Sequence, residues 1–242
     1  MFSYFYAINH NPYINEIKRI YSKNISSFKN TDDIEIICVD SNSTDGTIEF
    51  INKFGFKLYQ IDSTSRAARL NKGIKESNGE MILLHHPRSL LSVYAINELI
   101  EEQNELYWGA FTHKFDQNHK LLKFTSWYSN RVRGDLRKIF YLDHCIFIRR
   151  EILEDIGPIP EVDIFEDTEL CKLLNTVCDP IRLDSISTTS AVRFSKNGIW
   201  TQAIKNQFLK WKYYFKVDHK KLNKEYEKKV ALNAKYDSDR NT

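Results

Sequence analysis

Short apolar runs alternate with amphipathic stretches over the first part of the chain, up to residue 91. Apolar runs of about four to eight residues are typical of buried strands, and apolar residues at every third or fourth position are typical of helices. The pattern predicts strands at residues 2–8, 34–39, 57–61 and 80–85 and helices at residues 13–21, 47–54 and 66–76. Because strands that alternate with helices build a parallel sheet covered by helices, we expect an α/β fold.

The predicted elements become less regular after residue 91. The pattern predicts a helix at 92–102, strands at 106–115 and 140–148, and helices at 151–156 and 166–177. Residues 121–133 fit a helix and a strand equally well. Strands followed by irregular segments indicate a mixed sheet edge rather than another parallel repeat.

From Gly198 onward the chain is predicted to be helical, with aromatic and basic residues interleaved. The apolar positions with near-helical spacing are Trp200, Ile204, Phe208, Trp211 and Phe215, and the lysines among them are Lys205, Lys210, Lys212 and Lys216. A helix of this kind can lie on an anionic membrane surface as a peripheral contact. The same apolar stripe can pack on the protein core, which is the interpretation that we favour.

The composition is that of an ordinary globular protein, with 242 residues, 42% hydrophobic and 28% charged. A net charge of +3 is too small to indicate nucleic-acid binding, and we find no nucleic-acid recognition motif. The chain shows neither a signal-peptide pattern nor an apolar run of about 20 residues, so we expect a cytoplasmic location. The four cysteines are scattered without a Cys-x-x-Cys pair, which predicts free thiols rather than a zinc or redox site.

Residues 36–47, Ile-Ile-Cys-Val-Asp-Ser-Asn-Ser-Thr-Asp-Gly-Thr, are the most informative stretch. The apolar run stops at Asp40, and Ser43 and Gly46 favour a tight turn into the next helix. Ligands of open α/β sheets bind beyond the carboxyl ends of the strands, so Asp40 is placed to meet one. A capped strand-to-helix turn without a ligand explains the same residues.

The segment from Val39 to Thr47 resembles the first nucleotide-contacting motif of the family 2 glycosyltransferases, departing from it at Ser41 and Asn42. Further blocks in the same order extend the resemblance over about residues 33–222. It implies a GT-A fold, a Rossmann-like and mostly parallel sheet flanked by helices, with a mixed acceptor-side region and C-terminal helices. The implied division is a nucleotide-sugar-binding half at 1–91, an acceptor-side half at 92–197 and a helical extension at 198–242.

The resemblance also implies an activity, the transfer of a sugar from a UDP- or GDP-type nucleotide donor to a hydroxyl on a glycan or lipid-linked acceptor, with inversion. In the family, the acid at the position of Asp40 is implied to bind the base of the donor. We expect Asn9 and Asn42 to complete this side of the donor site.

Residues 65–73 resemble the family segment Gly-Arg-Ala-x-x-(Met or Leu)-Asn-x-Gly, with Arg66 and Asn71 at its polar positions. A guanidinium at a helix N-terminus adds to backbone N–H groups that favour anions, so Arg66 is the leading donor contact. A solvent-exposed helix arginine is the alternative. Arg193, within a late Ser-Ala-Val-Arg-Phe element, is expected to reach the diphosphate.

Residues 81–88, Met-Ile-Leu-Leu-His-His-Pro-Arg, stand where family members carry an Asp-x-Asp or His-Ala-Asp motif that holds Mg²⁺ or Mn²⁺. Pro87 replaces the metal-binding Asp and cannot ligate a metal. Three outcomes follow. Arg88 neutralises the diphosphate without a metal, or His85 or His86 serves as a metal ligand, or the chain is an inactive fold that acts as a binding module.

Residues 165–173 resemble the family's Glu-Asp-x-Glu-Leu block, in which the acid equivalent to Asp167 is the general base. A carboxylate suits that task when it lies about 3 Å from the reacting hydroxyl. The same acids also cap a helix N-terminus, and both roles can hold together. Acceptor-side contacts are expected from Glu166, from Trp108 and from His144, which stands where the family has a glutamine. All of this requires Asp40, Arg66 and Asp167 to converge on one cleft.

Overall fold

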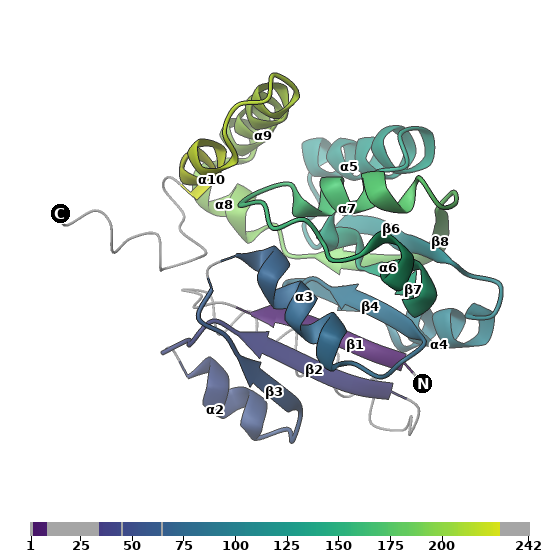
Figure 1. Cartoon of the computed structure of the whole chain (residues 1–242). Helices are drawn as coiled ribbons and strands as arrows, with labels where there is room; N and C mark the ends of the chain where they lie inside the picture. Colours follow the sequence, from purple (N-terminus) through teal and green to yellow (C-terminus); the bar gives the residue numbers. More distant parts are fainter. Residues whose placement is uncertain (1, 9–33, 45, 64, 228–242) are drawn as a thin grey trace.

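The computed structural model describes residues 2–8, 34–44, 46–63 and 65–227 (Figure 1). The described residues form an eight-stranded sheet in the order β3-β2-β1-β4-β7-β6-β8-β5. Its strands are β1 (Phe2–Ile8), β2 (Ile34–Asp40), β3 (Lys57–Gln60), β4 (Met81–His85), β5 (Ser89–Leu91), β6 (Trp108–Phe115), β7 (Ile146–Arg149) and β8 (Ile181–Thr189). The predicted helix at 13–21 and Asn9 lie outside the described residues.

The strands of the first half are parallel, as the alternating pattern predicts. β1 pairs with β2 on one side and β4 on the other, and β2 pairs with β3. In this register Ile8 lies opposite Asp40, and Tyr6 lies opposite His85. The carboxyl ends of β1, β2 and β4 therefore share one edge of the sheet, which is the edge where ligands of such sheets bind.

The second half adds the mixed edge that its irregular pattern predicts. β7 is antiparallel to both β4 and β6, while β8 runs parallel to β6 and antiparallel to β5. The pairing of β6 with β8 explains Gly109, because a Cβ there would lie 1.8 Å from the carbonyl oxygen of Ile181. The sequence analysis missed β8, whose residues are mostly polar and only partly buried.

Helices cover both faces of the sheet (Figure 1). They are α2 (Thr47–Asn52), α3 (Arg66–Glu76), α4 (Val93–Glu102), α5 (Lys120–Trp127), α6 (Arg150–Ile156), α7 (Glu166–Leu174), α8 (Val192–Asn197), α9 (Ile199–Tyr214) and α10 (His219–Glu227). β4 shows the two cores clearly. Leu83 packs with residues of α2 and α4, whereas Ile82 and Leu84 pack with residues of α3, α6 and α7. Burial on both faces is the reason that β4 is a continuous apolar run.

Two predictions for the middle of the chain need correction. The predicted strand at 140–148 is wrong in its first part, because residues 142–144 form a 3₁₀ turn, η2 (Leu142–His144), and Cys145 has a left-handed φ of 57°. Residues 121–133, left open between helix and strand, form α5 and the start of a π-helix, η1 (Tyr128–Leu136). The four cysteines are free thiols, as predicted.

The expectation that the aromatic stripe of the C-terminal helix packs on the core is wrong. Trp200, Phe208 and Trp211 on α9 are 65%, 60% and 68% exposed, and Phe215 just beyond it is 75% exposed. The side of α9 that faces the protein carries Leu209 and Gln202 instead. Among the described residues, no helix combines the length and the apolarity needed to cross a bilayer.

Candidate active site

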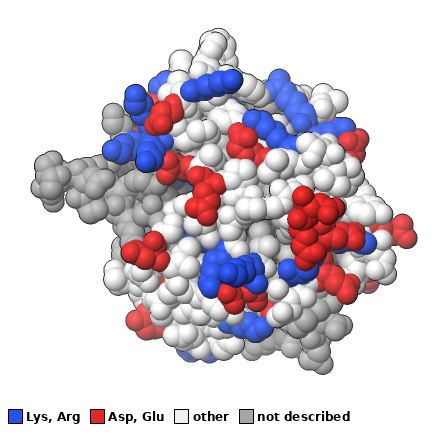
Figure 2. All heavy atoms as spheres, in the orientation of Figure 1, with Lys and Arg blue, Asp and Glu red and all other residues white. Residues whose placement is uncertain are grey.

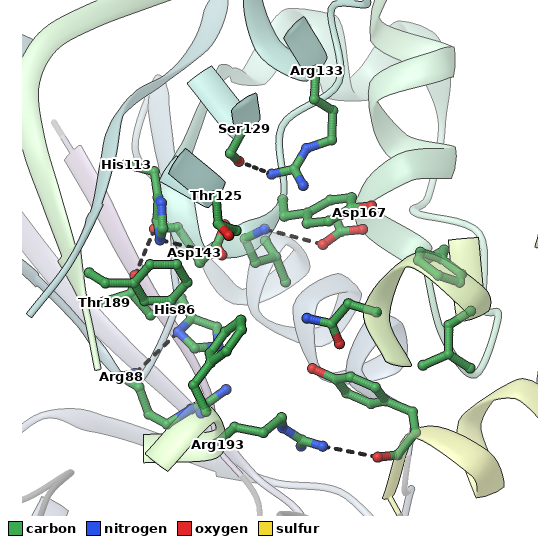
Figure 3. A pocket seen from close by; sticks show the side chains of 18 of the residues that line it. His86, Arg88, His113, Thr125, Ser129, Arg133, Asp143, Asp167, Thr189 and Arg193 are labelled. Carbon is green, nitrogen blue, oxygen red and sulfur yellow. Dashed lines mark hydrogen bonds and ion pairs between the residues drawn. The ribbon is translucent and has the colours of Figure 1, made fainter. Parts of the chain in front are cut away.

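A pocket of about 190 Å³ lies where the first turn of α7 meets the loop after β4, the end of β8 and the helices α8 and α9 (Figure 3). Four of the residues singled out in the sequence for donor binding or catalysis line it together: Arg66, Arg88, Asp167 and Arg193. His86, one of the two candidate metal ligands, lines it as well. These residues are far apart in the sequence, so the fold itself assembles the pocket.

Asp167 lies in the first turn of α7, directly after a sharp reversal of the chain. Phe165 adopts a left-handed φ of 67°, an uncommon conformation for an aromatic residue, which turns the backbone into the helix. The Asp167 carboxylate accepts hydrogen bonds from the backbone N–H of Thr168 at 2.8 Å and of Leu142 at 3.2 Å. Burial and the nearby Glu166 raise its pKa to about 7, so the carboxylate gains and loses a proton near neutral pH.

Arg66 begins α3, where the Ser65 hydroxyl caps the helix by accepting from the backbone N–H of Ala68 at 3.2 Å. The Arg66 guanidinium donates to the carboxylate of Glu166, which is almost fully buried. Glu166, expected on the acceptor side, has Arg66 as its partner in the structure. Glu166 holds Arg66 beside Asp167.

The opposite wall of the pocket is basic. The Arg193 guanidinium donates to the backbone carbonyl of Tyr226 at 3.1 Å and lies over the ring of the same tyrosine, 4.0 Å from its centre. Arg88 follows β4, and its backbone N–H donates to Nδ1 of His86 at 3.3 Å. Burial, with a smaller contribution from Arg88, lowers the pKa of His86, so this imidazole is neutral at pH 7. The positive charge of this wall therefore comes from arginines and not from the histidine.

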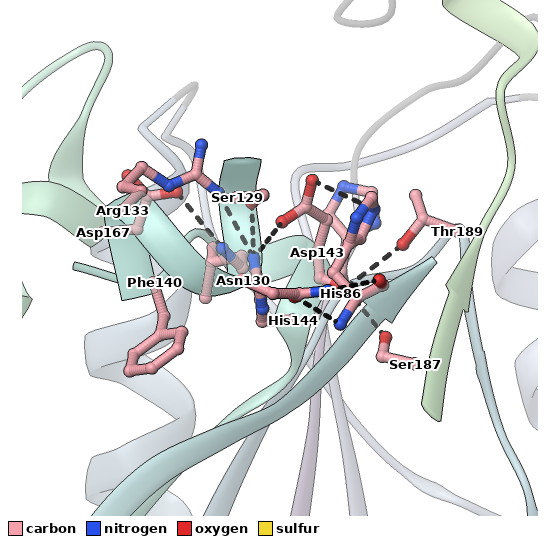
Figure 4. Close-up of polar contacts among 12 residues, drawn as sticks. His86, Ser129, Asn130, Arg133, Phe140, Asp143, His144, Asp167, Ser187 and Thr189 are labelled. Atoms are coloured by element: carbon pink, nitrogen blue, oxygen red, sulfur yellow. Dashed lines mark hydrogen bonds and ion pairs between the residues drawn. The ribbon is translucent and has the colours of Figure 1, made fainter. Parts of the chain in front are cut away.

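A second carboxylate, Asp143, lines the pocket beside a polar network (Figure 4). Its Oδ2 lies 3.6 Å from Nε2 of His113. Burial opposes ionisation of Asp143, but His113, His144 and Arg133 outweigh burial and hold its pKa well below its usual range. Burial lowers the pKa of both histidines, to about 3 for His144, so Arg133 is the lasting positive charge in this group.

His144 is fully buried behind the pocket wall and does not line the pocket. Its Nδ1 lies 3.0 Å from the carbonyl oxygen of Phe111, which can only accept, so Nδ1 carries the proton. Nε2 then accepts from the Ser129 hydroxyl at 2.7 Å. Arg133, one turn further along η1, donates to the same hydroxyl and lies 3.4 Å above the ring of Tyr141. His144, expected to contact the acceptor, thus touches the pocket wall through Ser129.

Sequence reasoning missed several pocket residues. Asp143, Arg133 and His113 line the pocket but were not singled out as site residues. Lys210 of α9 also lines the pocket, and burial lowers its pKa to about 8, which leaves it mostly protonated at pH 7. Residues 129–133, Ser-Asn-Arg-Val-Arg, are mostly polar, but the helix that carries them could not be placed from the sequence.

The structure does not bring the other predicted site residues into this pocket. Asp40 is fully buried at the end of β2, where it accepts from the backbone N–H and the hydroxyl of Ser43 at 2.6 and 2.5 Å. Asn42 follows it as an exposed residue with a left-handed φ of 55°. Arg66 and Asp167 thus share a cleft as expected, whereas Asp40 lies at the same sheet edge without lining that cleft.

Two further candidates have structural partners. The Asn71 side chain donates to the backbone carbonyl of Ile159 at 2.9 Å and accepts from its N–H at 2.8 Å, which ties α3 to the loop before α7. Trp108 is fully buried in the core, and its Nε1 donates to the carbonyl of Cys178 at 2.8 Å. Neither side chain is placed to touch a ligand in the pocket.

The donor set does not fit a resident Mg²⁺ or Mn²⁺. Within the described ranges, no three His, Cys, Asp or Glu side chains come together as metal ligands. His85 is buried in β4 away from the pocket, and burial lowers its pKa to about 3. His86 and Asp143 line the pocket, but these cations favour several oxygen ligands in near-octahedral geometry.

Three comparisons extend this picture. Residues 12–157 match the model of glycosyl transferase family 2. A "Probable glycosyltransferase YdaM" of Bacillus subtilis is 28% identical over 164 residues, which cover 57% of this chain and 38% of that protein. The chain thus spans little more than a third of this curated relative.

Solved structures with the same fold include the mannosyltransferase PcManGT of Pyrobaculum calidifontis in complex with GDP-Man and Mn²⁺. It has a TM-score of 0.63 and 16% identity, over 86% of this chain and 60% of that one. S. aureus TarS 1-349 in complex with UDP gives a TM-score of 0.57 at 14% identity, over 100% of this chain and 74% of that one. These similarities confirm the expected GT-A fold. With a family match over well over half of its length, the chain belongs to glycosyl transferase family 2.

Proposed function

We propose that the protein transfers a sugar from a nucleotide-diphosphate donor of the UDP or GDP type to a hydroxyl of a glycan or lipid-linked acceptor, with inversion. One observation carries the proposal. Asp167, a carboxylate whose pKa lies near neutrality, shares a pocket with the guanidinium groups of Arg66, Arg88 and Arg193. Family membership and relatives crystallised with GDP-Man and UDP support the donor class.

The chemistry needs a base and a stabilised leaving group. Asp167 accepts the proton of the incoming acceptor hydroxyl while the oxygen of that hydroxyl bonds to the reacting sugar carbon. The bond between that carbon and the diphosphate breaks on the opposite side, and the electron pair leaves with the diphosphate. Arg88 and Arg193 stabilise the negative charge that develops there, because cations that are already in position cost no reorganisation during the reaction.

Arg66 has a double role in this proposal. Its pairing with Glu166 fixes the guanidinium at the N-terminus of α3, where backbone N–H groups also favour anions. From there it contacts the donor phosphates on the side of Asp167. The base of the donor is proposed to bind at the end of β2, near Asp40 and Asn42, with Asn9. The division into donor-binding residues 1–91, acceptor-side residues 92–197 and a helical extension at 198–242 is part of the proposal, with Arg193 reaching the donor from the second stretch.

Asp143 is proposed to bind sugar hydroxyls. It stays ionised at all working pH values, so it accepts hydrogen bonds but is a poor proton acceptor. Asp167, with its raised pKa, is the better base. Two carboxylates in one pocket whose surroundings push their pKa values apart are thereby given separate roles.

The arginines are proposed to neutralise the diphosphate without a metal, since the donor set does not fit Mg²⁺ or Mn²⁺. The measurement is UDP and GDP affinity by calorimetry with EDTA and with Mn²⁺. We expect the two affinities of the preferred nucleotide to agree within about threefold. A rise of more than about tenfold with Mn²⁺ would revive a His86-assisted metal site.

Asp167→Asn tests the function. The variant should lose transfer by a factor of about 10² to 10⁴, the usual contribution of a general base, while nucleotide affinity stays within about twofold. Glu169→Gln, on the same helix turn but outside the pocket, is the matched control and should keep its activity. Full activity of Asp167→Asn would exclude it as the base. Nucleotide binding without transfer to any acceptor by the unmodified chain would favour the alternative, an inactive binding module.

We further propose that the reaction takes place in the cytoplasm, at the membrane surface where the acceptor is lipid-linked.

A further inference from the structure

The outer side of α9 is an unusually large apolar surface. Trp200, Ile204, Phe208 and Trp211 repeat at helical spacing on one side, and each is more than half exposed. Tyr214 and Phe215 continue the same exposed series at the end of the helix. Single exposed apolar residues are normal on a protein surface, but a contiguous series of large aromatic residues marks an interaction site.

Helix α5 extends this surface. Phe124 and Trp127 are more than half exposed and stack on each other with ring centres 5.7 Å apart. α5 and α9 are in contact, since Ile199 and Ala203 pack against the cluster that contains Leu122. Both helices lie along the same edge of the molecule (Figure 1). We call the exposed side chains of α5 and α9 the α5–α9 surface.

The charges on this surface have one sign. α5 and α9 contain lysines but no aspartate or glutamate. Lys120 and Lys123 of α5 are exposed, and Lys216 follows α9 as another exposed residue. Figure 2 shows several Lys and Arg side chains along the upper edge, where Figure 1 places the two helices, with a few Asp and Glu side chains of other elements near them. The partner of this surface must therefore accept aromatic side chains and carry negative charge.

We propose that the α5–α9 surface binds the surface of an anionic lipid membrane. Trp, Tyr and Phe side chains suit the boundary between head groups and acyl chains, and lysines around them attract anionic head groups. A second copy of the chain fits less well. In a two-fold dimer the same patch meets itself, so this basic surface would face another basic surface.

This inference rests on the proposed function and narrows its acceptor to the lipid-linked class. The inner side of α9 lines the pocket with Asn206, Leu209 and Lys210, while its outer side carries the aromatic series. A membrane that holds the outer side of α9 would therefore lie next to a wall of the pocket. An acceptor hydroxyl carried on a lipid would reach Asp167 from that side.

Co-sedimentation with lipid vesicles is the test. The full chain should bind vesicles of 75% phosphatidylcholine and 25% phosphatidylglycerol at least tenfold more tightly than pure phosphatidylcholine vesicles. The triple variant Trp200→Ser, Phe208→Ser and Trp211→Ser should lose at least tenfold in affinity for the anionic vesicles. Tyr94→Ser, which removes an exposed aromatic residue of α4, is the matched control and should bind like the unmodified chain. Lys120→Glu with Lys123→Glu tests the charge separately and should weaken binding at low salt by about tenfold.

Calorimetry with UDP and GDP in the absence of vesicles separates this inference from the proposed function. The triple variant should bind the preferred nucleotide as tightly as the unmodified chain, which also shows that it folds. Failure of the unmodified chain to bind anionic vesicles, or equal binding by the triple variant, would overturn the membrane proposal and leave the transfer proposal standing. A concentration-dependent dimer that the triple variant abolishes, without vesicle binding, would also overturn it. Vesicle binding by an unmodified chain that binds no nucleotide would overturn the proposed function and leave the membrane contact itself standing.

Discussion

The guanidinium of Arg66 donates to the carboxylate of Glu166, which lies 100 positions further along the chain. The pair joins the first turns of α3 and α7 and holds a negative charge next to Asp167. Burial is the main reason that the pKa of Asp167 is raised, and the negative charge of Glu166 adds to it, whereas Arg66 acts in the opposite direction. The behaviour of the proposed base therefore depends on its neighbour.

The first prediction concerns pH. Asp167 accepts a proton only when it is ionised, and its pKa is raised to about 7, so transfer should rise as pH increases through 7 and level off above it. Well below pH 7 the rate should fall about tenfold for each pH unit. The measurement is single-turnover transfer between pH 5 and 9 with the donor at saturation. A rate that stays constant from pH 5 to 8 would contradict this role.

The second prediction is that Glu166→Gln shifts this profile toward lower pH. Removing a like charge and leaving Arg66 next to Asp167 both favour the ionised carboxylate. The pH at which the rate reaches half of its maximum should therefore be lower in the variant. At pH 5.5 the variant should retain a larger fraction of its own maximal rate than the unmodified chain retains of its own. Glu169→Gln serves as control, because Glu169 bonds to Tyr213 and Lys172 outside the pocket. A midpoint that does not move would show that Glu166 has no electrostatic effect on the base.

A third prediction concerns the leaving group. Arg88→Ala and Arg193→Ala should each weaken UDP or GDP binding by about 10- to 100-fold, the value of one charge-assisted hydrogen bond. Arg131→Ala removes an arginine that is exposed on η1 and paired with Asp135, so its nucleotide affinity should be unchanged. Calorimetric titration with the nucleotide measures all three variants. Equal affinities in all of them would place the diphosphate outside this pocket.

The fourth prediction separates a structural role from a binding role. Asn71→Ala removes two hydrogen bonds to the backbone of Ile159 and should lower the free energy of unfolding by about 2 kcal/mol. Nucleotide affinity should stay within about twofold. Lys72→Ala, which removes a half-exposed pair with Glu76 and a contact with the ring of Tyr59, should change stability by less than about 1 kcal/mol. A large loss of nucleotide affinity in a stable Asn71→Ala protein would restore Asn71 to the donor site.

The sequence predicted the parallel half of the fold well, for a local reason. β4 is an apolar run buried on both faces, and α3 has a serine cap and a clear amphipathic repeat, so each can be read from its own residues. β8 and the turn at Leu142–His144 have no such local signal. Most residues of β8 are polar and are not fully buried, so the strand lacks an apolar run. Its pairing with β6 holds it in the sheet, and that pairing of distant segments cannot be read from the residues of β8.

The residues of the candidate site also divide into those with a local sequence signal and those without one. Arg66, Arg88, Asp167 and Arg193 belong to short motifs and lie together in the pocket. Asp143, Arg133 and His113 come from a turn, a π-helix and a strand whose convergence depends on the mixed half of the sheet. No spacing along the chain signals that convergence.

The π-helix η1 makes the position of Arg133 depend on the number of residues in this segment. Its hydrogen bonds span five residues, so each of its turns takes in more chain than an α-helix would. The wider turn takes in an extra residue while the residues on either side stay nearly in phase, so Arg133 lies close enough to donate to the hydroxyl of Ser129. Loss of one residue between Ser129 and Arg133 would tighten this turn into ordinary helix and change the reach of the Arg133 guanidinium toward that hydroxyl and toward the ring of Tyr141.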